Sequence, residues 1–314
     1  MALDLPNPSK PFRIGTRGSP LALAQAYEAR DRLAVSHDLP EDAFEIIVIK
    51  TTGDRVQDRP LKEIGGKGLF TREIEEDLLA GQLDIAVHSM KDMPVEQPAG
   101  LVLDTYLPRE DVRDALISPT AKTIADLPPE TTVGTSSLRR KAQLLNQRSD
   151  LKVVEFRGNV QTRMRKLSEG VAACTFLAMA GLNRLKMEEV PATPIAPEQM
   201  LPAIAQGAIG IERRQDDTRA AGMLEAIHDG PTGQQLQAER AFLAALDGSC
   251  ETPIAGLAIL TGTEVQLRGE ILRVDGSEAL NAKASSHVDD ASEMGRQLAK
   301  ELLAAAGPGF FNWH

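Results

Sequence analysis

The chain has 314 residues, 42% of them hydrophobic and 25% charged, and its net charge of −10 argues against a general binder of nucleic acid or anionic membranes, whose surface is basic. The N-terminus lacks the apolar core of a signal peptide and no run approaches a membrane span, so we predict a cytoplasmic protein with no membrane partner. The two cysteines and five histidines show neither a disulfide framework nor metal-ligand spacing, so we predict no metal.

The first predicted strand and helix are joined by a polar turn. Residues 12–15 have the pattern of a short strand, and residues 21–34 have that of an apolar-periodic helix. Ser19 suits the N-cap and Pro20 suits the first helical position. Arg17 and Ser19 beside this helix N-terminus are suited to hold an anion, because backbone N–H groups point outward there. The alternative is that Arg17 is a solvated loop residue.

A second strand and a glycine-rich loop follow. Residues 44–50 are rich in isoleucine and valine and predict a fully buried strand. Residues 64–70 contain Gly-Gly-Lys-Gly without the spacing or the Ser/Thr of a phosphate-binding loop, and a helix is predicted over residues 71–80. We interpret the segment around Lys67 as a flexible loop over a cleft. A simple linker is the alternative.

Residues 84–94 change within one run from an apolar strand to a polar group. Residues 85–87 predict a strand, and Ser89, Lys91 and Asp92 follow at its C-terminal end. Open α/β sheets place their ligands at that end. A carboxylate and an ammonium so close to an apolar strand need each other or a substrate, since an unpaired buried charge is costly. The alternative is a surface turn closed by Pro94.

The alternation of strands and helices restarts at Asp114, so we predict two α/β units of similar build. Arginines recur after the strands of this second unit, or early in the helix that follows: Arg139, Arg140, Arg157 and Arg163. Arg184 lies in a further segment, residues 179–185. The planar guanidinium binds carboxylate or phosphate in a bidentate manner. Several arginines at one sheet edge, in an acidic chain, predict a polyanionic small ligand.

The last third of the chain predicts a linker and then a small α+β domain. Prolines at 191, 194 and 197 indicate the linker, after which residues 201–212 return to strand-like apolar sequence. Further on we predict a helix near residues 218–228, a helix over 234–246, two strands over 255–260 and 264–274, and an amphipathic helix over 291–305.

The two cysteines lie in different surroundings. Cys174 is flanked by apolar residues and is predicted to be buried and inert. Cys250 lies in a Gly-Ser loop between a helix and a strand, where a thiolate can act as nucleophile or attachment point. The alternative is an ordinary, unreactive loop cysteine. No histidine is near it in sequence, so a cysteine-protease arrangement is not indicated.

Several of these motifs together resemble the porphobilinogen deaminase (hydroxymethylbilane synthase) family over nearly the whole chain. Any one motif is weak, but their shared order is specific. They are Thr16-Arg17-Gly18-Ser19-Pro20-Leu21-Ala22-Leu23, Gly65-Gly66-Lys67-Gly68-Leu69-Phe70, Asp84 to Pro94, Gly134-Thr135-Ser136-Ser137-Leu138-Arg139-Arg140, Arg157-Gly158-Asn159-Val160, Ala180-Gly181-Leu182-Asn183-Arg184, Leu201 to Glu212, and Gly248-Ser249-Cys250.

The resemblance implies a fold class of α/β type, with two domains like periplasmic binding proteins and a small α+β C-terminal domain. The domains expected are residues 1–107 with a return segment 206–225, residues 108–205, and residues 226–314. The resemblance also implies an enzyme that condenses four porphobilinogen molecules head to tail with loss of ammonia, followed by hydrolytic release of hydroxymethylbilane. We expect a monomer whose partner is this small-molecule substrate, with no nucleic acid.

The resemblance also implies residue roles. Cys250 would hold a dipyrromethane cofactor, assembled from two substrate molecules, through a thioether, and Asp92 would be the catalytic residue. The other cofactor-binding residues would be Lys91, Ser137, Arg139 and Arg140, together with Asp92. The substrate-binding residues would be Arg17, Ser19, Arg157, Arg163 and Arg184. A carboxylate such as Asp92 can stabilise the cation left when ammonia departs and accept hydrogen bonds from pyrrole N–H groups.

One position departs from the family pattern. Many relatives have a lysine four residues before Lys67, whereas this chain has Glu63 there, with Lys62 next to it.

Two other functional classes compete with this interpretation. A solute-binding protein or ligand sensor would share the two-lobed fold but would lack a third domain with a reactive cysteine. A phosphate-handling enzyme would explain the arginines, yet the sequence has no phosphate loop or metal set.

Overall fold

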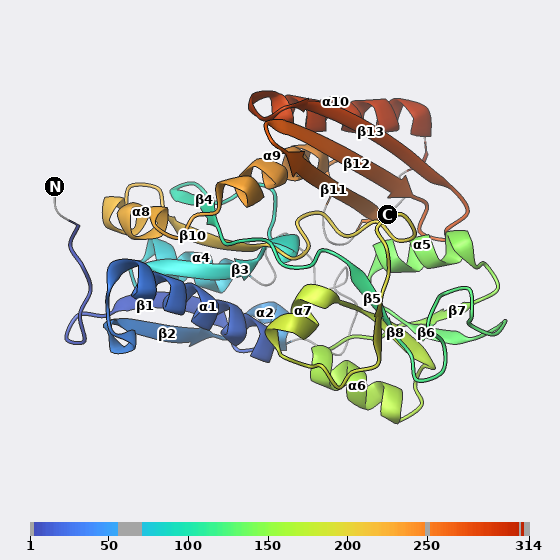
Figure 1. Cartoon of the computed structure of the whole chain (residues 1–314), viewed down its shortest axis with the longest axis horizontal. Helices are drawn as coiled ribbons and strands as arrows, with labels where there is room; N and C mark the ends of the chain where they lie inside the picture. The colour runs from blue at the N-terminus through green and yellow to red at the C-terminus, as the bar shows by residue number, and fades with distance from the viewer. Residues whose placement is uncertain (1–2, 56–70, 249–251, 308, 311–314) are drawn as a thin grey trace. The chain divides into compact units, whose positions relative to one another are not determined.

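A computed structural model of the chain describes residues 3–55, 71–248, 252–307 and 309–310 (Figure 1). The chain divides into two compact units, one formed by Met1–Glu110 with Ala208–Gly233 and the other by Asp111–Gly207 with Gln234–His314. Within the described ranges no helix has the length and apolar character needed to cross a membrane.

The first unit is an α/β fold around a five-stranded sheet. Its described elements are β1 (Phe12–Arg17), α1 (Pro20–His37), η1 (Glu41–Ala43), β2 (Phe44–Ile49), α2 (Thr52–Arg55), α4 (Arg72–Leu79), β3 (Ile85–Ser89), η2 (Met90–Asp92), β4 (Leu101–Tyr106), β10 (Ile209–Arg214) and α8 (Thr218–Glu225). The strand order is β2-β1-β3-β10-β4. β1 is parallel to β2 and β3, whereas β10 is antiparallel to β3 and β4.

Two apolar layers hold this sheet. On one face, Phe12 and Ile14 of β1 pack in one core cluster with residues of α1 and α8. On the other face, Ile74 and Leu78 of α4 pack with Ala86 of β3. Both faces of the central strands are therefore covered, which is why the polar groups of β1 and β3 are found at the strand ends.

The second unit begins with a five-stranded sheet of the same build. Its elements are β5 (Asp114–Ile117), β6 (Thr132–Gly134), α5 (Leu138–Gln147), β7 (Lys152–Val154), α6 (Val160–Ser168), β8 (Cys174–Ala178), α7 (Met179–Arg184) and β9 (Ala192–Pro194). The strand order is β7-β6-β8-β5-β9, with β6 parallel to β7 and β8, and β5 antiparallel to β8 and β9. One core cluster joins the sheet to Leu144 of α5, and another packs it against Met164 of α6 and Leu182 of α7.

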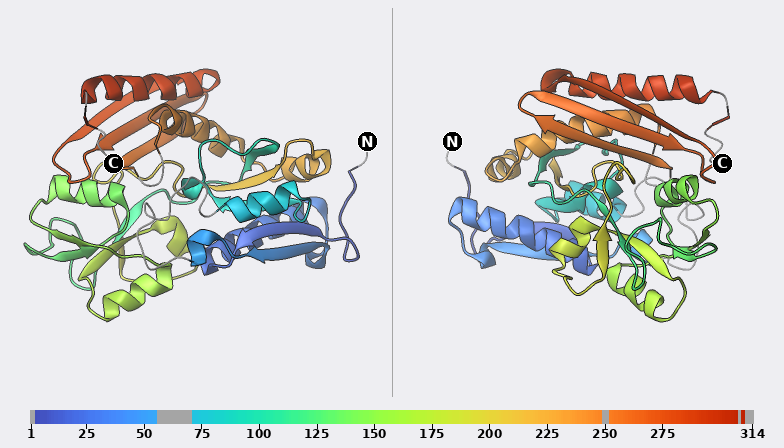
Figure 2. Two further views of the ribbon diagram at one scale, coloured as in Figure 1. Left: turned by 180° about the vertical axis from the view of Figure 1, so that it is seen from behind. Right: turned by 45° about the vertical axis from the view of Figure 1, so that its right-hand side comes forward.

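The second unit also contains a three-stranded antiparallel sheet. Its elements are α9 (Gly230–Ala245), which begins in the first unit, β11 (Ile254–Thr261), β12 (Glu264–Leu272), β13 (Ala279–His287), η3 (Val288–Asp290) and α10 (Ala291–Ala306). Figure 2 shows α10 lying along these strands. A Cβ at Gly269 would meet the ring of Phe242 from α9, and a Cβ at Gly295 of α10 would meet the backbone at Ala238, so α9, α10 and the sheet pack closely.

The predicted fold class is confirmed: two portions are α/β and a smaller C-terminal portion is α+β. The helix start at Pro20 is also confirmed, because Ser19 has extended backbone angles and its side chain accepts a hydrogen bond from Ala22 N. The domain boundaries at residues 107, 205 and 225 stay a prediction.

Four expectations about strands were wrong. The strand over residues 44–50 is not fully buried, because β2 lies at the sheet edge and Val48 is 49% exposed. The proline-rich linker contains β9, which is also an edge strand and so tolerates Pro194. Strand structure in 201–212 begins only at Ile209, since Ala205 and Gly207 have positive φ angles of 59° and 89°. The third strand of the C-terminal sheet, β13, went unpredicted because its run of small and polar residues lacks apolar alternation.

Candidate active site

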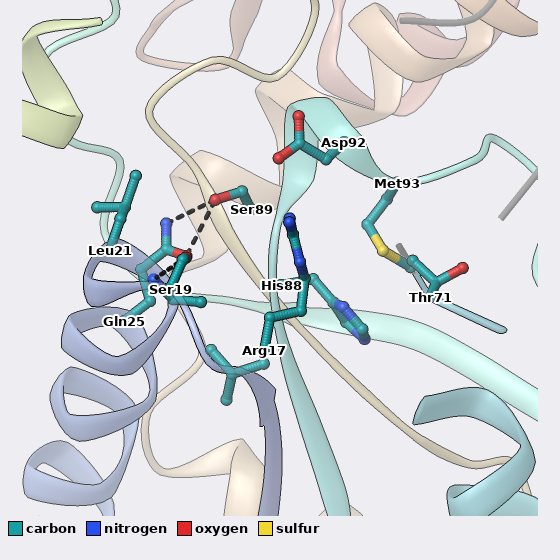
Figure 3. Close-up of a pocket in the computed structure, with 11 residues that line it drawn as sticks. Arg17, Ser19, Leu21, Gln25, Thr71, His88, Ser89, Asp92 and Met93 are labelled. Carbon is teal, nitrogen blue, oxygen red and sulfur yellow. Dashed lines mark hydrogen bonds between the residues drawn. The ribbon is translucent and has the colours of Figure 1, made fainter. Parts of the chain in front are cut away.

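A small pocket in the first unit lies where β1 leads into α1 and β3 leads into η2 (Figure 3). Arg17 and Ser19 line it from the turn before α1, and Ser89 and Asp92 line it from the end of β3 and from η2. Because β1 and β3 are neighbouring parallel strands, their carboxyl ends lie at the same sheet edge. The two polar stretches singled out in the sequence therefore meet here.

Asp92 stands out in this pocket by its lack of partners. It is half-buried, and within the described ranges no hydrogen bond or ion pair joins its carboxylate to another residue. Figure 3 shows the carboxylate clear of the other labelled side chains. Lys91, which precedes it, is half-buried as well. A carboxylate held at a strand end with its oxygens unused is suited to face a cation or N–H donors.

Gln25 is a pocket residue that the sequence analysis missed. It is buried on α1, and its amide Nε2 and Oε1 lie 2.8 Å and 2.9 Å from Ser89 Oγ. The contact joins α1 to the end of β3 and fixes the serine beside Asp92. The sequence feature that could have identified Gln25 is its place on the apolar face of the predicted helix, next to Ala26 and one turn before Ala29.

Below the pocket lies a buried pair of His88 and Glu212. His88 Nε2 is 3.0 Å from Glu212 Oε2, and both side chains are almost fully buried. Glu75 of α4 is close by, and burial raises the pKa of its carboxyl, with the Glu212 carboxylate adding to the effect. Asp84, at the other end of the strand, instead accepts a hydrogen bond from the backbone N–H of Arg13 at 2.7 Å. Asp84 therefore serves the sheet, whereas His88 lines the pocket.

The second unit brings several predicted residues to one sheet edge. β6, β7 and β8 are parallel, so the segments that follow them lie at the same edge. Ser137 caps α5, and its hydroxyl accepts a hydrogen bond from Arg140 N at 3.4 Å. Arg157 after β7, Arg163 early in α6 and Arg184 in the last turn of α7 are each half-buried. Arg163 Nε donates to Gly158 O at 2.9 Å and Arg184 Nη2 donates to Gly207 O at 3.0 Å.

Arg139 and Arg140 share a buried counter-ion that the sequence analysis did not identify. Arg139 Nη1 lies 2.8 Å from Asp114 Oδ2, and Arg140 Nη2 lies 2.7 Å from Asp114 Oδ1. Burial alone would raise the pKa of the Asp114 carboxyl, but the two guanidinium groups outweigh it and hold this pKa well below its usual range. The signal in the sequence was an aspartate heading a strand that is buried throughout.

The donors in this cluster leave room for an added carboxylate. Arg139 is 4% exposed, yet its Nε has no acceptor among the residues that the structure describes. A buried guanidinium group with an unused donor suits a ligand that carries carboxylates, as a substituted dipyrromethane does. In the described part of the chain, no group of three or more histidine, cysteine, aspartate or glutamate side chains is arranged to hold a metal.

Two predicted residues, Cys250 and Lys67, lie outside the described residues, as do Lys62 and Glu63. The predicted site residues therefore fall into two described groups. Arg17, Ser19 and Asp92, with Lys91 next to Asp92, belong to the first unit. Ser137, Arg139, Arg140, Arg157, Arg163 and Arg184 belong to the second unit.

Comparisons with known proteins cover nearly the whole chain. Residues 12–222 match the family model described as porphobilinogen deaminase, dipyromethane cofactor binding domain, and residues 234–304 match the one described as porphobilinogen deaminase, C-terminal domain. The chain is 63% identical over 310 residues to a porphobilinogen deaminase of Paracoccus denitrificans, with 99% of both chains covered. It is 52% identical to a chloroplastic porphobilinogen deaminase of Pisum sativum, covering 96% of this chain and 83% of the other.

Among solved structures, the chain is similar to a periplasmic substrate-binding protein of an ABC transporter from Coxiella burnetii. The sequence identity is 15%, the TM-score is 0.41, and the match covers 71% of this chain and 93% of the other.

Proposed function

The chain belongs to the porphobilinogen deaminase family, and on that premise we propose that it joins four porphobilinogen molecules head to tail, releases ammonia at each addition and hydrolyses off the linear product, hydroxymethylbilane. It is an enzyme, a transferase of porphyrin and heme biosynthesis, and porphobilinogen is its substrate. The observation that carries this function is the similarity itself, 63% identity across 99% of the chain.

We propose that Asp92 carries the chemistry. Its carboxylate has no partner among the described residues and is held at the end of β3 by a short 3-10 turn. When the substrate amine leaves, positive charge develops on the substrate, and a fixed carboxylate in a partly buried pocket stabilises that charge. The same oxygens can accept hydrogen bonds from the substrate's pyrrole N–H, which orients the ring.

The family has a dipyrromethane cofactor, and the residues of this chain fit it. When bound, this group supplies the pyrrole terminus to which substrate units are added. We propose that Cys250 attaches it through a thioether, and that Lys91, Ser137, Arg139 and Arg140, with Asp92, hold it. The unused Nε of buried Arg139 supports a carboxylate contact at that residue.

We propose that a further set of residues binds the acetate and propionate groups of substrate and growing product. Each porphobilinogen unit brings two carboxylates, so a lengthening chain needs many cationic donors. All of these residues are half-buried, and Arg17, Ser19 and Arg157 also lie at strand ends or beside a helix N-terminus, which supports the role. The residues are Arg17, Ser19, Arg157, Arg163 and Arg184.

Other features are proposed on the family resemblance alone. They are the three-domain division at residues 107, 205 and 225 with a return segment 206–225, a loop around Lys67 that closes during elongation, a monomeric state and a cytoplasmic location. Light scattering of the purified protein tests the monomeric state, since a mass near twice 33.9 kDa would contradict it.

Intact-mass measurement of the purified protein tests the proposed function most directly. We expect a mass above that of the polypeptide by two pyrrole units, and Cys250→Ser should remove this increment together with porphobilinogen turnover. Cys174→Ser is the matched control, because Cys174 is fully buried and burial raises its thiol pKa to about 11, which disfavours the reactive thiolate. Fully active protein with an unmodified mass would contradict the proposal.

A further inference from the structure

A buried chain of polar side chains in the second unit runs from the five-stranded sheet to the three-stranded sheet. It begins at Asp114 of β5, passes through Arg139 and Gln143 of α5, and ends at Glu270 of β12. Asp114, Arg139 and Gln143 are each at most 4% exposed. Because these groups are shielded from water, each must find its partners within the protein, and the loss of one partner affects the others.

Arg139 has its acceptors on one side only. Its Nη1 lies 2.8 Å from Asp114 Oδ2, 3.0 Å from Gln143 Oε1 and 3.1 Å from Leu201 O. Its Nε has no acceptor in the described ranges, and Nη2 has no hydrogen bond there either. The three acceptors around Nη1 thus hold the guanidinium plane, and its Nε–Nη2 edge is left to meet a carboxylate side-on.

Gln143 must keep one amide orientation to hold the Arg139 guanidinium in this position. Its Oε1 accepts from Arg139, so its Nε2 must point the other way, where it donates to Leu201 O at 3.0 Å and to Glu270 Oε2 at 2.5 Å. A flipped amide would present N–H groups to the guanidinium and lose both acceptors. Glu270 is the only side chain among the described residues that accepts from this amide, and an ionised carboxylate can accept hydrogen bonds but cannot donate them, so it requires the N–H side of the amide.

Glu270 is held in this place by the second sheet. It lies on β12 opposite Asn281 of β13, on the side of the strand away from Phe242 and α9. Burial raises the pKa of its carboxyl, while Gln143, Asn281 and the charge of Arg139 oppose that rise. These contacts offset part of the cost of burying the charged carboxylate.

We propose that Glu270 is a positioning residue for Arg139: through Gln143 it fixes the guanidinium so that the Nε–Nη2 edge faces the carboxylate of a bound pyrrole. This proposal rests on the proposed function. It gives the C-terminal sheet a role in ligand binding, because β12 then orients a binding residue of α5. Removal of the acceptor should slow carboxylate capture without unfolding the protein.

The test is the rate at which full-length, cofactor-free protein acquires the mass of two pyrrole units from porphobilinogen. We expect Glu270→Ala and Gln143→Met to acquire it about tenfold more slowly than the parent chain, the size of effect expected when a charged hydrogen bond that orients a donor is lost. Glu270→Gln, which keeps an acceptor oxygen, should stay within about twofold. Glu264→Ala is the matched control, since Glu264 is exposed on the same strand.

The other outcomes are distinct. Parent-like loading in both Glu270→Ala and Gln143→Met would overturn the proposal, and faster loading in Glu270→Ala and Glu270→Gln alike would overturn it by showing that the Glu270 charge competes with the ligand. A purely structural role for Glu270 would appear in two ways. Glu270→Ala would unfold at a clearly lower temperature than the parent chain, and Glu270→Gln would load as slowly as Glu270→Ala; together these results would overturn the proposal. A parent chain that never acquires the mass would instead refute the proposed function, and the inference with it.

Discussion

The two five-stranded sheets have the same build but hold their acidic residues in opposite ways. In each, three adjacent parallel strands are extended by an antiparallel strand, β10 in one and β5 in the other. In each, the strand at the second position leads to a helix capped by serine, Ser19 or Ser137. Yet Asp92 has no partner in the described chain, whereas Asp114 accepts from two arginines.

This difference shows how one backbone frame can serve two kinds of chemistry. A carboxylate with unused oxygens at the edge of a pocket can respond to charge that develops on a substrate. A carboxylate that is fully buried between two guanidinium groups cannot, and it instead makes the burial of those cations tolerable. The first arrangement suits a reacting centre, and the second suits a fixed binding wall for carboxylates.

The largest expected effect comes from removing the unpaired acid. Asp92→Ala should lower porphobilinogen turnover by about 10³-fold, because the developing positive charge loses its fixed counter-charge. Stability should change little, since no described residue loses a hydrogen bond. Steady-state kinetics and thermal unfolding measure the two effects. Glu96→Ala, an exposed acid four residues further along, is the control, and a near-parental rate in Asp92→Ala would refute the assignment.

Removing Asp114, the acid that pairs with two arginines, should mainly reduce stability. Asp114→Ala leaves two buried guanidinium groups without their anion and should lower the free energy of unfolding by about 3–5 kcal/mol. Urea unfolding measures this loss. The matched control is Glu293→Ala, whose exposed pair with Arg296 should contribute at most about 1 kcal/mol. Equal losses in the two variants would mean that the Asp114 cluster is no more important than a surface pair.

The same carboxylate predicts a pH dependence of stability. The pKa of Asp114 is lower in the folded chain than its ordinary value near 3.8, so its contribution is complete above that value and is lost as the pH falls toward the folded pKa. Urea unfolding between pH 6 and pH 3 should therefore show a stability difference between parent and Asp114→Asn that shrinks below about pH 4. Glu75, whose pKa is raised, contributes with the opposite sign in both proteins and cancels in the difference. Parallel curves would contradict the prediction.

The sequence predicts one side of this comparison better than the other. The helix starts at Ser19 and Ser137 and the polar run around Asp92 follow local rules, because caps and strand ends are specified by neighbouring residues. Asp114 is 25 residues from Arg139 in sequence, and Glu270 is 127 residues from Gln143. Such partners depend on strand order and register across the whole unit, which periodicity and spacing do not encode. The missed strand β13 has the same cause, since its place depends on pairing with β12.

The smallest effects concern the two capping serines, and they separate capping from binding. Ser19→Ala and Ser137→Ala should each lower the free energy of unfolding by about 1 kcal/mol, because each loses the acceptor for the first turn of its helix. Aspartate caps as well as serine, so Ser19→Asp and Ser137→Asp should keep stability while placing a negative charge where carboxylates are expected to bind. Their KM for porphobilinogen should then rise above that of the alanine variants. If the aspartate variants bind substrate as well as the parent does, the two serines act as caps only, and the carboxylate-binding role must rest on the arginines.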